Sequence, residues 1–133
     1  MKVVVNVDGG SRGNPGPAAV AAVVTDDSGA ELTERAETIG EATNNVAEYR
    51  ALLLGIQLAK EVGAGEVELV ADSMLAVEQV RGNWKVKQAH LKPLRERVRK
   101  ELADFDSWSI RHVRRGDNER ADELLNDALD AAA

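Results

Sequence analysis

Residues 2–8 read KVVVNVD, and residues 9–17 continue with GGSRGNPGP. The first stretch is short and rich in β-branched residues, which is typical of a strand, and the second has the Gly and Pro content of a loop. Asp8 ends the otherwise apolar stretch. We therefore expect the chain to begin with a buried strand whose carboxyl end presents a carboxylate.

The segments after this loop predict two more strands and then an alternation of helices and strands. Apolar residues recur with a period of about 3.6 in the helical segments, whereas the other segments are short and β-branched. Asn44 or Asn45 is the expected N-cap of the first helix. The predicted strands cover about 18–25, 30–39, 66–71 and 107–114, and the predicted helices cover about 43–63, 73–81, 89–104 and 118–131.

This order of elements predicts the fold class α/β. Three consecutive strands form an antiparallel meander, and the later strands, each following a helix, are expected to run parallel to its first strand. The result is a mixed five-stranded sheet flanked by helices. A length of 133 residues fits one domain, which we place at 1–133.

The composition excludes several classes of protein. The absence of cysteine excludes a disulfide scaffold, a thiolate nucleophile and any site with Cys ligands. The longest apolar run, residues 18–24, is too short to span a bilayer, and the start of the chain lacks the apolar region of a signal peptide. We therefore expect a cytoplasmic protein without a membrane partner, and a monomer by default.

The net charge of −6 hides one basic segment. Residues 81–100 contain eight Lys or Arg and a single Glu, although acidic residues predominate in the rest of the chain. Two interpretations remain open. The segment is either a solvated helix face or a footprint for a polyanion, because clustered Lys and Arg neutralise phosphates.

Four carboxylates occupy unusual places. Asp8 and Asp72 end apolar strands that are expected to be parallel neighbours, so both lie where open α/β sheets place their functional sites. Glu48 borders the inward face of the first long helix, and Asp122 lies one turn into the last helix. Taken singly, each could be a turn former, a cap or a solvated residue. Together they would repel one another unless a hard divalent cation such as Mg²⁺ or Mn²⁺ were bound.

Such a cluster suits phosphoryl transfer with two metal ions. The chain also resembles type 1 ribonuclease H in four blocks that appear in the family's order, each with an acid. The resemblance extends from about residue 2 to residue 130. The blocks are VDGGSRGNPGPAA (7–19), TNNVAEYRALLLGI (43–56), VADSMLAV (70–77) and DNERADELLNDA (117–128).

The resemblance implies an RNase H-like fold and an endonuclease that hydrolyses the RNA strand of RNA–DNA hybrids. It implies two Mg²⁺ or Mn²⁺ ions and products with 5′-phosphate and 3′-hydroxyl ends. The family's catalytic and metal-binding carboxylates fall on Asp8, Glu48, Asp72 and Asp122. Asn14, Asn44 and Asn45 match positions that contact the nucleic-acid backbone, and Ser11 and Ser73 fall near such positions.

The chain departs from the longer family members in its basic segment. Many members have an extra basic helix and loop, the basic protrusion, which grips the DNA strand. Here Arg81 and Gly82 lead directly into Asn83-Trp84-Lys85-Val86-Lys87, so the chain resembles the compact bacterial and archaeal members. Lys85 and Lys87 are expected to replace the protrusion in part, and Trp84 either stacks on the nucleic acid or anchors the segment.

A second departure concerns the loop before the last helix. Family members with a longer loop carry an auxiliary His there. The spacing from Asp122 points to His112, but His112 belongs to a predicted strand, so we expect a structural histidine and place Arg115 in the loop.

Three other interpretations remain open. The chain could be an RNase H-like module that binds hybrid or double-stranded RNA with weak or no cleavage, or a nuclease of the same fold that acts on DNA. A structural Ca²⁺-binding protein is a more distant alternative because the chain has no EF-hand spacing.

Overall fold

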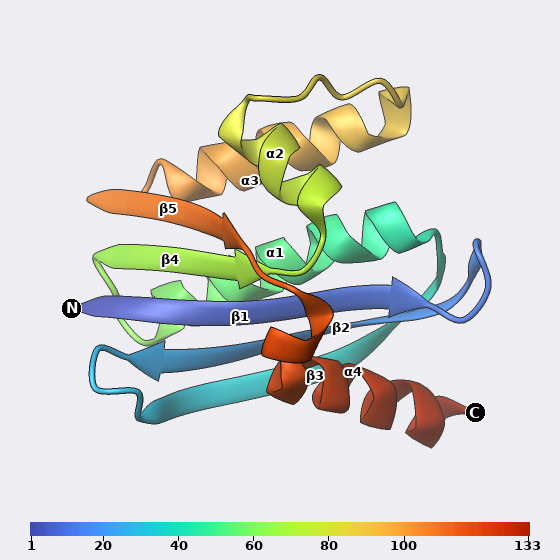
Figure 1. Cartoon of the computed structure of the whole chain (residues 1–133), viewed down its shortest axis with the longest axis horizontal. Helices are drawn as coiled ribbons and strands as arrows, with labels where there is room; N and C mark the ends of the chain where they lie inside the picture. The colour runs from blue at the N-terminus through green and yellow to red at the C-terminus, as the bar shows by residue number, and fades with distance from the viewer.

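Five strands form one mixed sheet in the order β3-β2-β1-β4-β5 (Figure 1). The computed structural model describes residues 1–133. β1 (Lys2–Ser11) pairs antiparallel with β2 (Gly16–Asp26), which pairs antiparallel with β3 (Glu31–Ala42). On its other side β1 runs parallel to β4 (Glu66–Ala71), which runs parallel to β5 (Ser107–His112). The predicted fold class is confirmed.

Four helices connect or follow these strands. They are α1 (Asn44–Glu61), α2 (Met74–Arg81), α3 (Lys92–Leu102) and α4 (Glu119–Ala132). Short 3-10 turns, η1 (Ala89–Leu91) and η2 (Arg115–Asp117), precede α3 and α4. Only residues 82–91 separate α2 from α3, so no additional helix lies at the place of a basic protrusion. None of the helices is long and apolar enough to cross a membrane.

The start of α1 differs from the prediction. Its N-cap is Thr43, whose side chain accepts a hydrogen bond from the Val46 amide at 3.3 Å. Asn44 is the first helical residue, and its side chain accepts from the Ser11 amide at 2.8 Å. The prediction of Asn44 or Asn45 as the cap was wrong because Asn44 bonds across to β1, and this contact between distant segments leaves no local signal in the sequence.

Helices cover both faces of the sheet (Figure 1). Along β2, alternate residues enter different clusters of buried side chains: Val20 and Val24 pack with α1, α2 and α3, whereas Ala19 and Ala21 pack with Leu125 of α4. A strand buried on both faces shows a continuous apolar run, which is what residues 18–24 display.

Two glycines allow α1 to lie unusually close to β1. A Cβ at Gly55 would lie 2.6 Å from Val7 Cγ1, and a Cβ at Gly9 would lie 2.1 Å from the Ala47 carbonyl oxygen. Any larger residue would push the helix and the strand apart. The close approach brings the N-terminal half of α1 over the carboxyl end of β1.

Candidate active site

Asp8 and Asp72 lie next to each other because of the strand register. Val7 of β1 pairs with Ala71 of β4, and the two aspartates follow these residues in parallel strands. Asp8 is only 3% exposed. The two aspartates thus lie side by side where the pairing of β1 with β4 ends, as predicted for neighbouring parallel strands. The prediction that Asp8 ends its strand was wrong, because Gly9, Gly10 and Ser11 continue β1 by pairing with β2.

The other two acids reach the same place from helices on opposite faces of the sheet. Glu48 lies in the second turn of α1, over Gly9, and Asp122 lies in the first turn of α4. The carboxylate of Asp122 is close enough to Asp8 to raise its pKa. An open cleft of about 420 Å³ is lined by Gly9, Gly10, Ser11, Arg12, Asn44, Glu48, Asp72, Arg115, Asp122, Leu125, Asn126 and Leu129.

Burial and mutual repulsion change the ionisation of this cluster. Burial raises the pKa of Asp8 to about 8, and the carboxylates of Asp72 and Asp122 add to this effect. Burial also raises the pKa of Glu48, although a hydrogen bond from the Ser73 hydroxyl opposes the change. The guanidinium of Arg115 lowers the pKa of both groups. Without a cation, the site therefore retains a proton on Asp8 at neutral pH.

The donor set fits a hard divalent cation. The Oδ2 atoms of Asp8 and Asp72 are buried and have no hydrogen-bond partner, and they are the only such side-chain atoms in the protein. A buried carboxylate oxygen without a partner is costly, and a cation would satisfy it. No three acidic or His side chains stand at the geometry of a metal site in this structure, and Glu48 and Asp122 are the acids that would complete the ligands beside Asp8 and Asp72. The residues present therefore fit the predicted Mg²⁺ or Mn²⁺.

Three of the predicted nucleic-acid-binding residues form one hydrogen-bonded cluster beside the acids. Asn44 Oδ1 accepts from the amide and the hydroxyl of Ser11, at 2.8 and 3.1 Å. The Asn44 amide donates to Asn14 Oδ1 at 3.1 Å. Ser73 is the N-cap of α2, and its hydroxyl also reaches Glu48. These contacts join the first loop, α1 and α2 around the cleft.

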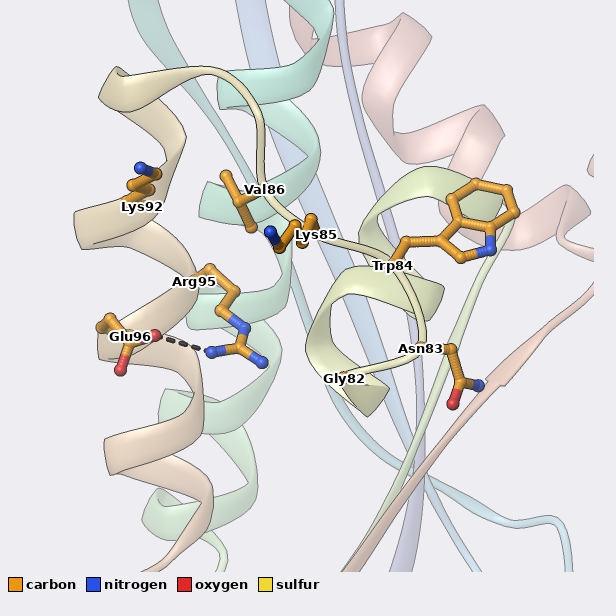
Figure 2. A pocket seen from close by; sticks show the side chains of 8 residues that line it. All are labelled: Gly82, Asn83, Trp84, Lys85, Val86, Lys92, Arg95 and Glu96. Atoms are coloured by element: carbon orange, nitrogen blue, oxygen red, sulfur yellow. Dashed lines mark hydrogen bonds and ion pairs between the residues drawn. The ribbon is translucent and has the colours of Figure 1, made fainter.

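Of the other predicted contacts, Asn45 lies in α1, and Trp84, Lys85 and Lys87 lie in the loop of residues 82–88. Asn45 Nδ2 approaches Gln88 Oε1 at 3.5 Å, which brings this loop to the N-terminus of α1. Trp84, with a 45% exposed side chain, lies between two hollows of about 540 and 320 Å³. Lys85 lines both hollows, and Lys87 lines the smaller one. Figure 2 shows the Trp84 indole directed away from Lys92 and Arg95, on the other side of the loop.

His112 and Arg115 are separated as expected. His112 is a half-buried residue of β5 that pairs with Ala71, whereas Arg115 lines the acidic cleft. The structure therefore supports a sheet position for His112 and a position in the site for Arg115.

Some residues at the site were not predicted from the sequence. Arg12 and Asn126 line the acidic cleft, and Gln88 lines the smaller hollow with Trp84 and Lys87. Arg12 belongs to the same turn-rich loop as Asn14, so its place in that loop is a usable signal. Asn126 lies one turn after Asp122 on α4, and helical spacing alone could have identified it.

Comparison with known proteins identifies the family. A family model described as "Reverse transcriptase-like" matches residues 6–128. The chain is 49% identical over 125 residues to "Ribonuclease HI" of Halobacterium salinarum, with 94% of this chain and 63% of that protein covered. It is also 49% identical over 134 residues to a "Bifunctional protein" of Mycobacterium tuberculosis, with 100% of this chain and 37% of that protein covered. The chain thus spans less than two thirds of the length of these relatives.

Solved structures agree with this assignment. The crystal structure of RNase H1 from Halobacterium salinarum superposes with a TM-score of 0.96 at 46% identity, covering 98% of this chain and 99% of that one. LC11-RNase H1, crystallised in complex with RNA/DNA hybrid, gives a TM-score of 0.92 at 40% identity, with 98% of both chains covered. Together with the three acids that line one cleft and the buried Asp8 beside them, these similarities show that the chain belongs to the type 1 ribonuclease H family, in its compact form without a basic protrusion.

Proposed function

We propose that the protein is a metal-dependent endonuclease that hydrolyses the RNA strand of RNA–DNA hybrids and leaves 5′-phosphate and 3′-hydroxyl ends. The observation that supports this most directly is the pair Asp8 and Asp72, whose buried Oδ2 atoms have no partner in the protein. Two bound Mg²⁺ or Mn²⁺ ions would supply activation of water and stabilisation of the leaving oxygen.

The four acids would hold these ions from three directions. Asp8 and Asp72 come from the sheet, Glu48 from α1 and Asp122 from α4. The Ser73 hydroxyl opposes the rise in the pKa of Glu48, and Asp8 must release its proton before it can bind an ion. Arg115 favours the ionised forms of Asp8 and Glu48, and as a residue that lines the cleft it would contact a phosphate of the cut strand.

We assign substrate binding to groups that would contact the sugar-phosphate backbone of the nucleic acid. The Ser11–Asn14–Asn44 cluster and Asn45 offer neutral hydrogen-bonding groups beside the acids, and Lys85 and Lys87 offer charge further away. Neither lysine has a carboxylate within ion-pair distance, although the protein has six more acidic than basic residues. Readout of this kind selects a duplex by shape and 2′-hydroxyls rather than by base sequence. That LC11-RNase H1 was crystallised with RNA/DNA hybrid supports the same substrate class.

A second candidate is an RNase H-like module that binds hybrid or double-stranded RNA with weak or no cleavage. The short segment between α2 and α3 favours it, because the chain has fewer groups than longer family members to hold the DNA strand. The four clustered acids favour the enzyme.

A cleavage assay on three substrates separates the two candidates. End-labelled RNA is annealed to DNA, annealed to RNA, or left single-stranded, and each form is incubated with Mg²⁺, with Mn²⁺ or with chelator. We expect metal-dependent cuts in the hybrid and products that a 5′-phosphate-dependent exonuclease degrades. Binding of the hybrid without cleavage under any metal would instead establish the binding module.

A further inference from the structure

The loop of residues 82–88 is held in place by polar contacts with α2. Gly82, with a φ of 89°, ends α2, and the amides of Asn83 and Trp84 both donate to the Glu78 carbonyl, at 2.9 and 3.2 Å. Asn83 Nδ2 donates to Glu78 Oε2 at 2.9 Å. These bonds fix the first half of the loop, but Lys85 and the residues after it need another support.

That support is a buried glutamine that bridges α1 and the loop. Gln79 is 3% exposed, and its side-chain amide donates to the Lys85 carbonyl at 3.3 Å. Its Oε1 accepts from the hydroxyl of Tyr49, a buried residue of α1, at 2.5 Å. A buried amide is costly unless both of its ends are satisfied, and here one end is used by α1 and the other by the loop. Tyr49 follows Glu48 directly, so the same turn of α1 serves the cleft and the loop.

The basic residues around this bridge divide into two groups. The arginines serve the structure: Arg95 donates to the Gln79 carbonyl at 3.0 Å, and Arg99 donates to the Val80 carbonyl at 2.8 Å, so both cap the carboxyl end of α2. Arg95 also pairs with Glu96 at 2.7 Å (Figure 2). The lysines of the loop form no ion pair. Lys85 and Lys87 are therefore unpaired charges on the segment that Gln79 holds. Lys92, Arg97 and Lys100 also form no ion pair, but they belong to α3 and lie outside that segment.

We propose that Tyr49 and Gln79 are positioning residues for substrate binding, which hold Lys85 and Lys87 at a fixed place relative to Glu48 through the hydrogen bond to the Lys85 carbonyl. This inference rests on the proposed hybrid ribonuclease activity. A pre-ordered loop binds a phosphate backbone without the entropy cost of ordering two lysines at once. The bridge thereby orders the basic loop of the compact chain at the place where longer family members have an additional helix.

The test is hybrid binding by Tyr49→Phe, Gln79→Met and the double variant, measured in chelator so that cleavage does not interfere. Tyr49→Phe removes a single hydroxyl, so it is expected to keep the fold even if Gln79→Met does not. We expect each single variant to raise the Kd by about five- to tenfold, which corresponds to one buried hydrogen bond. The double variant should bind the hybrid no more weakly than either single variant, because the two residues act as one unit.

Three further readouts distinguish positioning from general stability. With metal present, KM should rise in Tyr49→Phe while kcat is unchanged, and the dependence of Kd on salt should become shallower because the lysines no longer act together. Amide exchange in residues 85–88 should become faster. Ile56→Val serves as the control, since it is a buried change two turns along α1 that does not touch the loop.

Four outcomes would overturn the inference. If Tyr49→Phe and Gln79→Met bind the hybrid as tightly as the wild type does, the inference is refuted and the proposed activity is left intact. A fall in kcat without a rise in Kd, or equally weakened binding in Ile56→Val, would show that the bridge acts on the cleft or on stability instead. A wild-type protein that neither binds nor cuts the hybrid would refute the proposed activity together with the inference.

Discussion

Asp8 and Asp72 are placed side by side by the pairing of Val7 with Ala71, and each retains one buried carboxylate oxygen without a partner. The pairing of β1 with β4 ends at Val7 and Ala71, so the residue that follows each of them lies beside the other. The protein therefore places two like charges next to each other in a site where Asp8 is almost fully buried. Such an arrangement is unfavourable in isolation and becomes favourable when a cation is bound.

This arrangement predicts an unusual dependence of stability on pH in the absence of metal. Burial and the neighbouring carboxylates raise the pKa of Asp8 from 3.8 to about 8 in the folded protein. Between these values the folded state binds more protons than the unfolded state, so the free energy of unfolding should fall as pH rises, by up to about 1.4 kcal/mol per pH unit. The contribution is fully present below about pH 4 and is lost as pH rises through about 8.

Urea unfolding in chelator between pH 5 and pH 8 measures this dependence. Asp8→Asn should flatten the curve and make the metal-free protein more stable than the wild type at pH 8. Adding Mg²⁺ at pH 8 should restore stability to the wild type, because the ion requires the deprotonated carboxylate. Wild-type stability that stays constant or rises over this range would contradict the account.

The close packing at Gly9 predicts that no side chain is tolerated at this position beside the acids. A Cβ at this position would lie 2.1 Å from the Ala47 carbonyl oxygen, so Gly9→Ala must push α1 away from β1. We expect stability to fall by about 1–3 kcal/mol, and kcat to fall by about 100-fold because Glu48 moves away from Asp8. Gly10→Ala is the stability control, since a Cβ there would meet only Leu125 and Asn44, at 3.5 and 3.7 Å. Equal melting temperatures for the two variants would argue against a close approach at Gly9.

Lys85 and Lys87 are predicted to account for part of the electrostatic attraction to the hybrid. Replacing both by Ala should weaken binding and reduce the slope of log K against log salt by about 0.9 for each phosphate that the variant no longer neutralises. Lys2→Ala is a suitable control because Lys2 is exposed at the start of β1, away from the carboxyl end where the cleft lies. If the slope were the same in the lysine variant and in the control, the electrostatic footprint would lie elsewhere.

His112 is predicted to contribute to stability rather than to catalysis. It is a half-buried residue of β5 whose backbone pairs with Ala71, the residue before Asp72. His112→Ala should lower the free energy of unfolding by about 1 kcal/mol and leave kcat little changed. Thermal unfolding and single-turnover cleavage on the same sample separate the two effects. A variant of normal stability with a large fall in kcat would assign His112 to the reaction.

The sequence predicted those features that depend on local patterns. Strand and helix order followed from period and turn residues, and Asp8 and Asp72 were identifiable because each directly follows an apolar run. The continuation of β1 past Asp8 to Ser11 was not predicted, because the Gly residues there indicated a loop. Features that depend on contacts between distant segments were missed. Asn44 was taken for a cap because nothing near it in sequence indicates its bond to Ser11. The bridge from Tyr49 through Gln79 to Lys85 was equally hidden, since a tyrosine and a glutamine in two helices have no shared signature.

The basic segment of residues 81–100 is a second case in which the sequence did not reveal contacts made in the folded protein. Its composition left open whether the eight basic residues form a solvated helix face or a footprint for a polyanion, because charge counts do not distinguish free groups from those used in packing. In the structure Arg81, Arg95 and Arg99 donate to backbone carbonyls, whereas Lys85 and Lys87 form no ion pair. Three of the eight basic residues are therefore used in packing. The remaining ones are divided between the loop after α2, with Lys85 and Lys87, and α3, with Lys92, Arg97 and Lys100.

The most direct test of the central claim is cleavage of an RNA–DNA hybrid by Asp72→Asn and by wild type, with Mg²⁺, with Mn²⁺ and with chelator. The substitution removes a metal-binding charge without changing shape, so the account predicts that cleavage falls by at least about 100-fold with an unchanged or higher melting temperature. Asp127→Asn, an exposed change on α4, should cut like the wild type. Cleavage by Asp72→Asn at the wild-type rate, or cleavage by wild type in chelator, would contradict it.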